Sequence, residues 1–99
     1  MKAFKTYDKE SLKMTAAVEV YTTTYCPYCV RAKELLKAKG VEYKEINVEG
    51  DDEARAALIK KSDGRRTVPQ IFINGAAIGG FDDMYALDRA GKLDPLLKG

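Results

Sequence analysis

Residues 18–29, VEVYTTTYCPYC, join a predicted strand to a predicted helix through a pair of cysteines, and the rest of the fold can be worked out from this junction. Its first five residues alternate in short β-branched steps, a pattern typical of a strand. Residues 30–39 are rich in Ala, Leu, Lys and Glu, and they predict a helix that Gly40 ends. Cys26 and Cys29 therefore lie where the first strand ends and the first helix begins.

The rest of the chain continues this alternation of strands and helices. Acidic residues at 51–53 suit the first turn of a helix, and Asn74-Gly75 is a strong signal for a two-residue hairpin. The predicted later elements are a strand at 41–48, a helix opening at 51–53, a strand at 70–73, a hairpin strand at 76–78, and a helix opened by Asp82 and Asp83 that Gly91 and Pro95 stop. The order β-α-β-α-β-β-α predicts an α/β fold, a four-stranded mixed sheet flanked by three helices.

The composition excludes several classes of function. The 99 residues suffice for one domain, with 45% hydrophobic and 32% charged side chains. There is no histidine, so catalytic triads with histidine, haem ligation through a proximal histidine and Cys₂His₂ zinc sites are excluded. A net charge of +2 is too weak to indicate nucleic acid or an anionic membrane as a partner.

The positive charge belongs to the leading segment. Residues 1–17 hold four lysines against two acids, which leaves residues 18–99 balanced. We expect residues 1–17 to form an extension, either flexible or a short helix, and residues 18–99 to form the domain. The extension has neither the apolar run nor the cleavage site of a secretory signal. Two cysteines in a chain without an export signal predict a reducing, cytoplasmic location.

The two cysteines carry the chemistry that the sequence predicts. Cys26 at the start of a helix lies near unpaired backbone N–H groups, which favour a thiolate over a thiol. Cys29, one turn further on, is shielded and can attack a mixed disulfide formed on Cys26. The prediction is a nucleophile, Cys26, and a resolving thiol, Cys29, with no metal. A structural disulfide and half of a zinc or iron–sulfur site shared between two chains are the alternatives.

Three ordered motifs then resemble the dithiol glutaredoxins, and within them the small bacterial glutaredoxin 3 group. They are Tyr25-Cys26-Pro27-Tyr28-Cys29 after a strand, Thr67-Val68-Pro69 before a strand, and Gly79-Gly80-Phe81-Asp82-Asp83 before a helix. The resemblance covers residues 18–97 and implies a thioredoxin-like fold. It also implies a monomeric thiol–disulfide oxidoreductase that acts on glutathionylated and disulfide-containing proteins. Glutathione would be its reductant, and no cofactor would be tightly bound.

The resemblance also implies a glutathione site. Val68, before a cis-Pro69, would offer its backbone to the cysteinyl unit, and Arg65 would contact the glycyl carboxylate. The γ-glutamyl end would dock where Asp82 and Asp83 open a helix. The implied glutathione-contacting residues are Tyr28, Arg65, Thr67, Val68, Pro69, Gly80, Phe81, Asp82 and Asp83. On the residues alone, a helix cap, a solvated loop arginine, an exposed tyrosine and a proline at a strand start explain the same positions.

Two positions depart from the family pattern. Thr23 stands where relatives usually carry a lysine, so one source of thiolate stabilisation is missing. Phe81 stands where close relatives often have a third cysteine. Two other functions stay open: a redoxin recharged by thioredoxin reductase, and a dimer that holds a [2Fe–2S] cluster through Cys26 and glutathione. Pro27-Tyr28 disfavours the cluster, because cluster-binding relatives carry smaller residues there.

Overall fold

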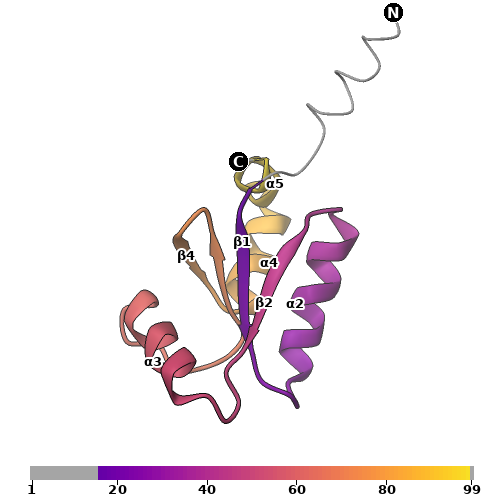
Figure 1. Ribbon diagram of the computed structural model, residues 1–99. Coiled ribbons are helices and arrows are strands. Elements are labelled where there is room, and N and C mark those ends of the chain that lie inside the picture. The colour runs from indigo at the N-terminus through magenta and orange to yellow at the C-terminus, as the bar shows by residue number, and fades with distance from the viewer. Residues whose placement is uncertain (1–15, 99) are drawn as a thin grey trace, which may run out of the picture.

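The computed structural model describes residues 16–98 and confirms the predicted order of strands and helices (Figure 1). The elements are β1 (Val18–Thr22), α2 (Pro27–Ala38), β2 (Tyr43–Asn47), α3 (Asp52–Lys61), β3 (Gln70–Ile73), β4 (Ala76–Gly79), α4 (Phe81–Arg89) and α5 (Leu93–Leu97). Strand β2 is shorter than the predicted 41–48. The strand starts later because the Val41 N–H donates to the Leu36 carbonyl at the end of α2 and not to a neighbouring strand.

The strands form one mixed sheet in the order β2-β1-β3-β4. β1 pairs in parallel with β2, and β3 runs antiparallel to both β1 and β4. The hairpin between β3 and β4 turns at Asn74 and Gly75, which both adopt positive φ as the Asn-Gly signal predicts. β1 is therefore a central strand, and its carboxyl end delivers the chain directly to the cysteines.

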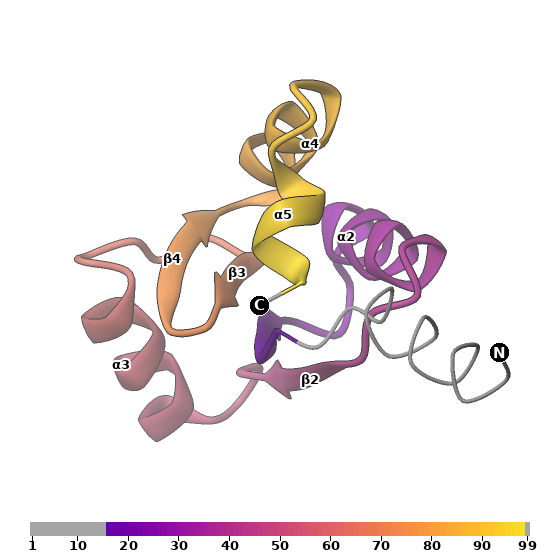
Figure 2. The ribbon, with the colours of Figure 1, turned by 90° about the horizontal axis from the view of Figure 1, so that it is seen from above.

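Helices cover both faces of this sheet. Seen from above, α3 lies on one side, and α2 and α4 lie on the other (Figure 2). Alternate residues of the central strands divide between two cores. Val20 and Ile71 pack toward Leu36 and Met84, whereas Tyr21 and Phe72 belong with Leu58 of α3 to the second core.

A short helix that the sequence did not predict completes the fold. Gly91 and Pro95 were expected only to stop the third helix, but Pro95 is the third residue of α5. A proline fits the first turn of a helix because the N–H groups there have no partner within the helix. Leu93 and Leu97 of α5 are fully buried, so this turn closes one end of the first core.

The described chain begins with two residues of the predicted extension. The Ala16 N–H donates to the Leu97 carbonyl at 2.9 Å, and the Ala17 N–H donates to Oδ1 of Asn74 at 2.9 Å. Residues 1–15 lie outside the described residues, so the character of the extension stays a prediction. No helix within residues 16–98 has the length and apolar character needed to cross a membrane.

Candidate active site

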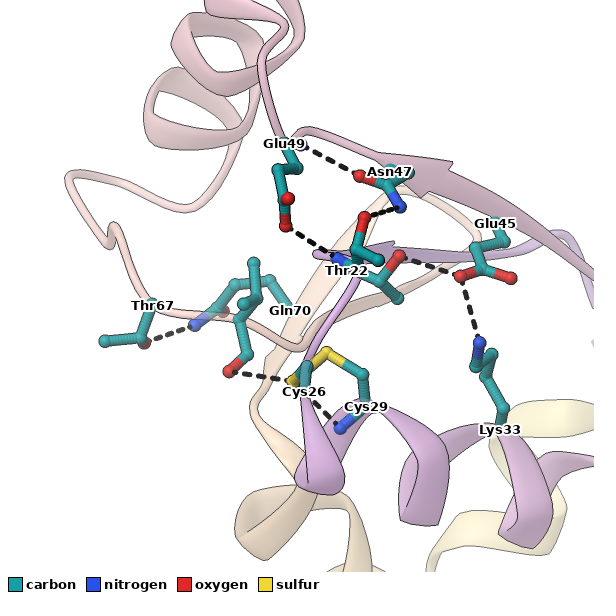
Figure 3. The surroundings of a disulfide bond; sticks show 11 residues. Thr22, Cys26, Cys29, Lys33, Glu45, Asn47, Glu49, Thr67 and Gln70 are labelled. Carbon is teal, nitrogen blue, oxygen red and sulfur yellow. Dashed lines mark hydrogen bonds and ion pairs between the residues drawn. A yellow bond between two sulfur atoms is a disulfide. The ribbon is translucent and has the colours of Figure 1, made fainter.

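The two cysteines occupy the first turn of α2 and are joined as a disulfide (Figure 3). Cys26 is the N-cap, with an extended backbone, and Pro27 is the first helical residue. The Cys29 N–H points at Sγ of Cys26 at 3.1 Å. Cys29 is 1% exposed, while Cys26 is partly exposed. The burial of Cys29 agrees with the expectation that it is the shielded cysteine, and the division of roles between the two cysteines stays a prediction.

The start of α2 favours a thiolate on Cys26 once the disulfide is reduced. Its sulfur lies at the positive end of the helix dipole, with a backbone N–H aimed at it. Thr23, three residues earlier, contributes no charge. The groups placed at the Cys26 sulfur that favour a thiolate are therefore backbone N–H groups at the start of α2.

A cis peptide bond faces the dithiol. The Val68–Pro69 bond is cis, as the resemblance to glutaredoxins implied. The Val68 carbonyl oxygen lies 3.9 Å from Sγ of Cys26. The loop before β3 and the start of α2 thus meet at the reactive sulfur, although 42 residues separate Val68 from Cys26 in the chain.

A groove of about 270 Å³ extends from this meeting point. Its lining residues are Tyr28, Arg65, Thr67, Val68, Pro69, Gln70, Gly80, Phe81, Asp82 and Asp83. All nine residues expected to contact glutathione are therefore brought together from α2, the loop before β3, and the start of α4. Their contact with glutathione stays a prediction.

Opposite charges face one another in this groove. Nη1 of Arg65 lies 3.5 Å from Oδ2 of Asp83, and the same oxygen accepts the Gly80 N–H at 3.0 Å. Gly80 is the N-cap of α4, and the Asp83 carboxylate, in the first turn of that helix, accepts the hydrogen bond of the Gly80 N–H. Gly79 makes this close approach feasible, because a Cβ there would collide with the Asp83 carboxylate and lie 2.8 Å from Arg65 Nη1.

Gln70 lines the groove and was not anticipated from the sequence. Its side chain is 2% exposed, and Nε2 donates to Oγ1 of Thr67 at 3.1 Å (Figure 3). Its buried Oε1 has no hydrogen-bond partner among residues 16–98. Gln70 thereby ties the start of β3 to the loop that holds Pro69. The signal in the sequence was a lone polar residue opening an apolar strand directly after a proline.

A second polar cluster lies between α2 and the sheet. The Thr22 hydroxyl donates to Oε2 of Glu45 at 2.8 Å, and Nζ of Lys33 donates to the same oxygen at 3.0 Å. Partial burial alone would raise the pKa of the Glu45 carboxyl, but the hydrogen bonds from Thr22 and Lys33 outweigh it and lower that pKa below its usual value. The cluster connects β1, β2 and α2 beside the dithiol.

Within residues 16–98, no group of three or more His, Cys, Asp or Glu side chains is placed to hold a metal ion. The redox-active groups available in this part of the chain are the two thiols. The two cysteines lie at a helix start and face a cis-proline loop, on a sheet with the strand order β2-β1-β3-β4. This combination defines a thiol–disulfide oxidoreductase of thioredoxin-like fold. The family model for glutaredoxin matches residues 18–78. The chain belongs to the glutaredoxin family.

Individual relatives agree with this assignment. The chain is 58% identical to glutaredoxin 3 of Escherichia coli over 83 residues, which cover 84% of this chain and 99% of the relative. It is 55% identical to a probable glutaredoxin of Synechocystis over 86 residues, covering 87% of this chain and 98% of that protein. These identities are high enough to carry the oxidoreductase activity of glutaredoxins to this chain.

Solved structures show the same fold. A crystal structure of a buckwheat glutaredoxin–glutathione complex matches with a TM-score of 0.75 at 35% identity, covering 97% of this chain and 88% of that one. The solution structure of glutaredoxin from Brucella melitensis matches with a TM-score of 0.74 at 49% identity, covering 86% and 91%. The thioredoxin-like fold class is thereby confirmed.

Proposed function

We propose that this chain reduces protein–glutathione mixed disulfides and protein disulfides, with glutathione as the reductant held in the groove beside Cys26. The observation that carries the proposal is the continuity of groove and dithiol. Val68 lines the groove, and its carbonyl lies 3.9 Å from the Cys26 sulfur. A tripeptide in the groove would therefore have its cysteine next to the nucleophile.

The groove has the polarity that glutathione requires. Glutathione carries a carboxylate at its glycyl end, and both a carboxylate and an ammonium at its γ-glutamyl end. Arg65 would bind the glycyl carboxylate with a guanidinium fork. At the other end, the N-terminus of α4 would bind the γ-glutamyl carboxylate, and Asp82 or Asp83 would bind the ammonium.

The middle of the groove would hold the peptide backbone. Val68 would pair with the cysteinyl unit as a one-residue strand addition, next to Thr67 and Pro69. The rings of Tyr28 and Phe81, with centroids 6.4 Å apart, form an apolar wall. Phe81 supplies ring area at a position where a third cysteine would introduce a competing thiol.

The reaction then proceeds by two thiol–disulfide exchanges. The Cys26 thiolate attacks the glutathione sulfur of a mixed disulfide, forms a bond to it, and releases the target protein as a thiolate that takes a proton from water. A second glutathione, as thiolate, attacks the bound glutathione sulfur. Oxidised glutathione leaves, and Cys26 returns as a thiolate.

Protein disulfides would use both cysteines. Cys26 attacks first and is joined to the target, and the Cys29 thiolate then displaces the target and closes the Cys26–Cys29 disulfide. Two glutathione molecules reduce that disulfide. Every group in this scheme belongs to one chain or to glutathione, which supports a monomer without a tightly bound cofactor. Free thiols of this kind suit the reducing cytoplasm.

The groove is tested by a matched pair of arginine variants. Arg65→Gln removes the guanidinium that lines the groove, whereas Arg66→Gln removes the neighbouring guanidinium, which does not line it. Turnover of a glutathionylated peptide should show a KM for the peptide about tenfold higher in Arg65→Gln, as expected for one lost charge-assisted contact. Arg66→Gln should match the wild type. Equal KM values in both variants would show that Arg65 does not contact glutathione.

A further inference from the structure

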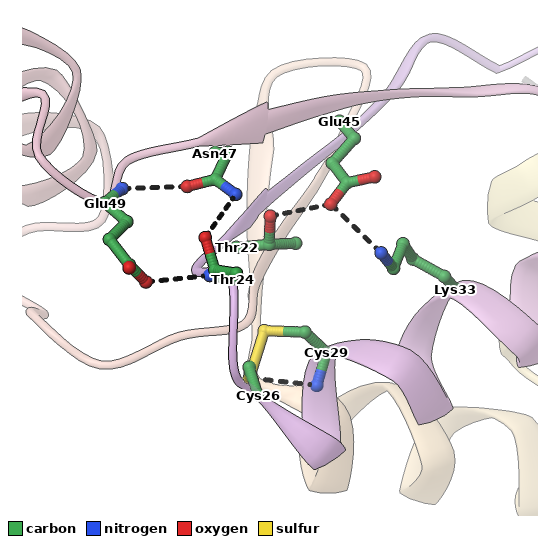
Figure 4. A network of polar contacts seen from close by, with 8 residues as sticks. All are labelled: Thr22, Thr24, Cys26, Cys29, Lys33, Glu45, Asn47 and Glu49. Atoms are coloured by element: carbon green, nitrogen blue, oxygen red, sulfur yellow. Dashed lines mark hydrogen bonds and ion pairs between the residues drawn. A yellow bond between two sulfur atoms is a disulfide. The ribbon is translucent and has the colours of Figure 1, made fainter.

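The loop that carries Cys26 is tied to the connection between β2 and α3. Oε1 of Glu49 accepts the Thr24 N–H at 2.9 Å, and the Glu49 N–H donates to Oδ1 of Asn47 at 2.9 Å (Figure 4). Nδ2 of Asn47 donates a longer hydrogen bond of 3.4 Å to Oγ1 of Thr24. Thr24, Asn47 and Glu49 therefore form a closed ring of hydrogen bonds. These side chains continue the parallel pairing of β1 and β2 beyond the ends of both strands.

This attachment holds a segment with little other support. Residues 23–25 are the whole link between the last residue of β1 and the N-cap Cys26. Thr24 is exposed and Tyr25 is 90% exposed, so packing contributes little to their position. The hydrogen bonds to Asn47 and Glu49 are therefore what fixes the loop two residues before the nucleophile.

Glu49 also brings an unbalanced charge to this loop. The titratable and charged groups on the elements around the dithiol include Tyr25 of the loop, Tyr28, Cys29, Arg31 and Lys33 of α2, Glu45 of β2, Glu49 after β2, Arg65 before β3, and Asp82 and Asp83 of α4. Lys33 is paired with Glu45, and Arg65 with Asp83. Within the described residues Glu49 has no cationic partner, and Thr23 adds no charge. A carboxylate in this place opposes ionisation of a nearby thiol.

We propose that Glu49 is a positioning residue with two opposed effects on Cys26. Its hydrogen bond to Thr24 holds the loop in the reactive arrangement, and its negative charge makes the Cys26 thiolate form at higher pH than the helix N-terminus alone would set. Glu49 thus limits the thiolate fraction while it fixes the geometry. Intrinsic nucleophilicity falls as a thiol becomes more acidic, so such a limit keeps Cys26 reactive in exchange.

Two substitutions separate the two effects. Glu49→Gln retains an oxygen that accepts the Thr24 N–H but removes the charge, whereas Glu49→Ala removes both. Glu53→Gln is the matched control, because Glu53 is an exposed first-turn residue of α3 that takes no part in the ring. Three quantities are measured in a Cys29→Ser background. They are the ultraviolet titration of the reduced Cys26 thiolate, its rate of alkylation against pH, and kcat/KM for a glutathionylated peptide; only the last rests on the proposed function.

We expect Glu49→Gln to shift the titration midpoint to lower pH and to raise the alkylation rate below that midpoint by about twofold. This is the effect of one solvent-exposed charge that is hydrogen-bonded two residues before the nucleophile. The difference should shrink at high salt. Glu49→Ala should show the same shift in midpoint, but its kcat/KM should fall severalfold because the loop is released. Glu53→Gln should behave as the wild type.

A midpoint in Glu49→Gln equal to that of the wild type would overturn the electrostatic effect. Full kcat/KM in Glu49→Ala would overturn the positioning effect. Thiolate titration and alkylation involve no glutathione, so their outcome is independent of the proposed glutathione groove.

Discussion

Arg65 and Asp83 face each other across the groove, with Nη1 of Arg65 3.5 Å from Oδ2 of Asp83. We assign Arg65 to the glycyl carboxylate of glutathione and Asp82 or Asp83 to the ammonium at its other end, so this ion pair must open for Arg65 and Asp83 to make both contacts. In the empty groove each charge is therefore partly balanced by the other. Both side chains are more than half exposed, so their attraction is screened and contributes little to folding. Their contribution should appear in ligand affinity.

The first prediction concerns Asp83. Asp83→Asn keeps an oxygen that can accept the Gly80 N–H but loses the charge for the ammonium of glutathione. The free energy of unfolding should change by less than about 1 kcal/mol, while the KM for a glutathionylated peptide should rise severalfold. Asp52→Asn, in the first turn of α3 and away from the groove, is the control for kinetics. An unchanged KM in Asp83→Asn would leave Asp82 as the partner of the ammonium, and an unchanged KM in Asp82→Asn as well would contradict the assignment.

The second prediction separates the roles of the cysteines. Cys29→Ser should keep the removal of glutathione from peptides, because that cycle uses only Cys26 and glutathione. It should abolish the reduction of protein disulfides that depend on resolution by the buried Cys29 thiol. Both substrates are assayed with the same glutathione supply. Loss of both activities together would show that the division of labour is wrong.

The third prediction tests whether α5 belongs to the core. Leu97 is fully buried, and its neighbour Leu96 is 40% exposed. Leu97→Ala should lower the free energy of unfolding by about 2–5 kcal/mol, whereas Leu96→Ala should cost less than about 1 kcal/mol. Urea unfolding measures both. Similar losses in the two variants would mean that α5 does not pack as described.

The fourth prediction concerns acid stability. The pKa of the folded Glu45 carboxyl is lowered, so its ionised form favours the folded state. That contribution is complete above the unfolded-state pKa, near 4.5, and is lost as the pH falls through the lower folded value. Glu45→Gln should therefore lose less stability than the wild type on acidification below about pH 5.

The control for this titration is Glu42→Gln, at an exposed position before β2. Unfolding by urea at a series of pH values should give Glu42→Gln the same acid slope as the wild type. An unaltered slope in Glu45→Gln would mean that the hydrogen bonds from Thr22 and Lys33 do not stabilise the carboxylate.

Local patterns in the sequence predicted most of the fold. The alternation in 18–22 and the apolar residues 71–73 predicted the two central strands, and Asn74-Gly75 predicted the hairpin between β3 and β4. These signals act over a few residues, so they can be identified without knowledge of the tertiary structure. The helix α5 was not predicted, because a proline such as Pro95 usually marks the end of a helix. Its burial depends on long-range packing against the first core.

The candidate site was predicted in two ways. The chemistry of Cys26 and Cys29 followed from their place at a strand–helix junction, whereas the groove came from the resemblance to glutaredoxins. Gln70 and Glu49 were missed because each acts through a contact that the sequence does not reveal. Gln70 reaches Thr67 across a cis-proline turn, and Glu49 reaches Thr24 across 25 residues of chain.

The electron donor that the protein accepts distinguishes a glutathione-dependent oxidoreductase from a redoxin recharged by thioredoxin reductase. The oxidised protein and a glutathionylated peptide are supplied either with glutathione, glutathione reductase and NADPH, or with thioredoxin reductase and NADPH. We expect rapid NADPH consumption only with glutathione, and we expect it to be lost in Cys26→Ser. Turnover with thioredoxin reductase and none with glutathione would contradict this expectation, and the groove would then be no more than the space beside a helix cap.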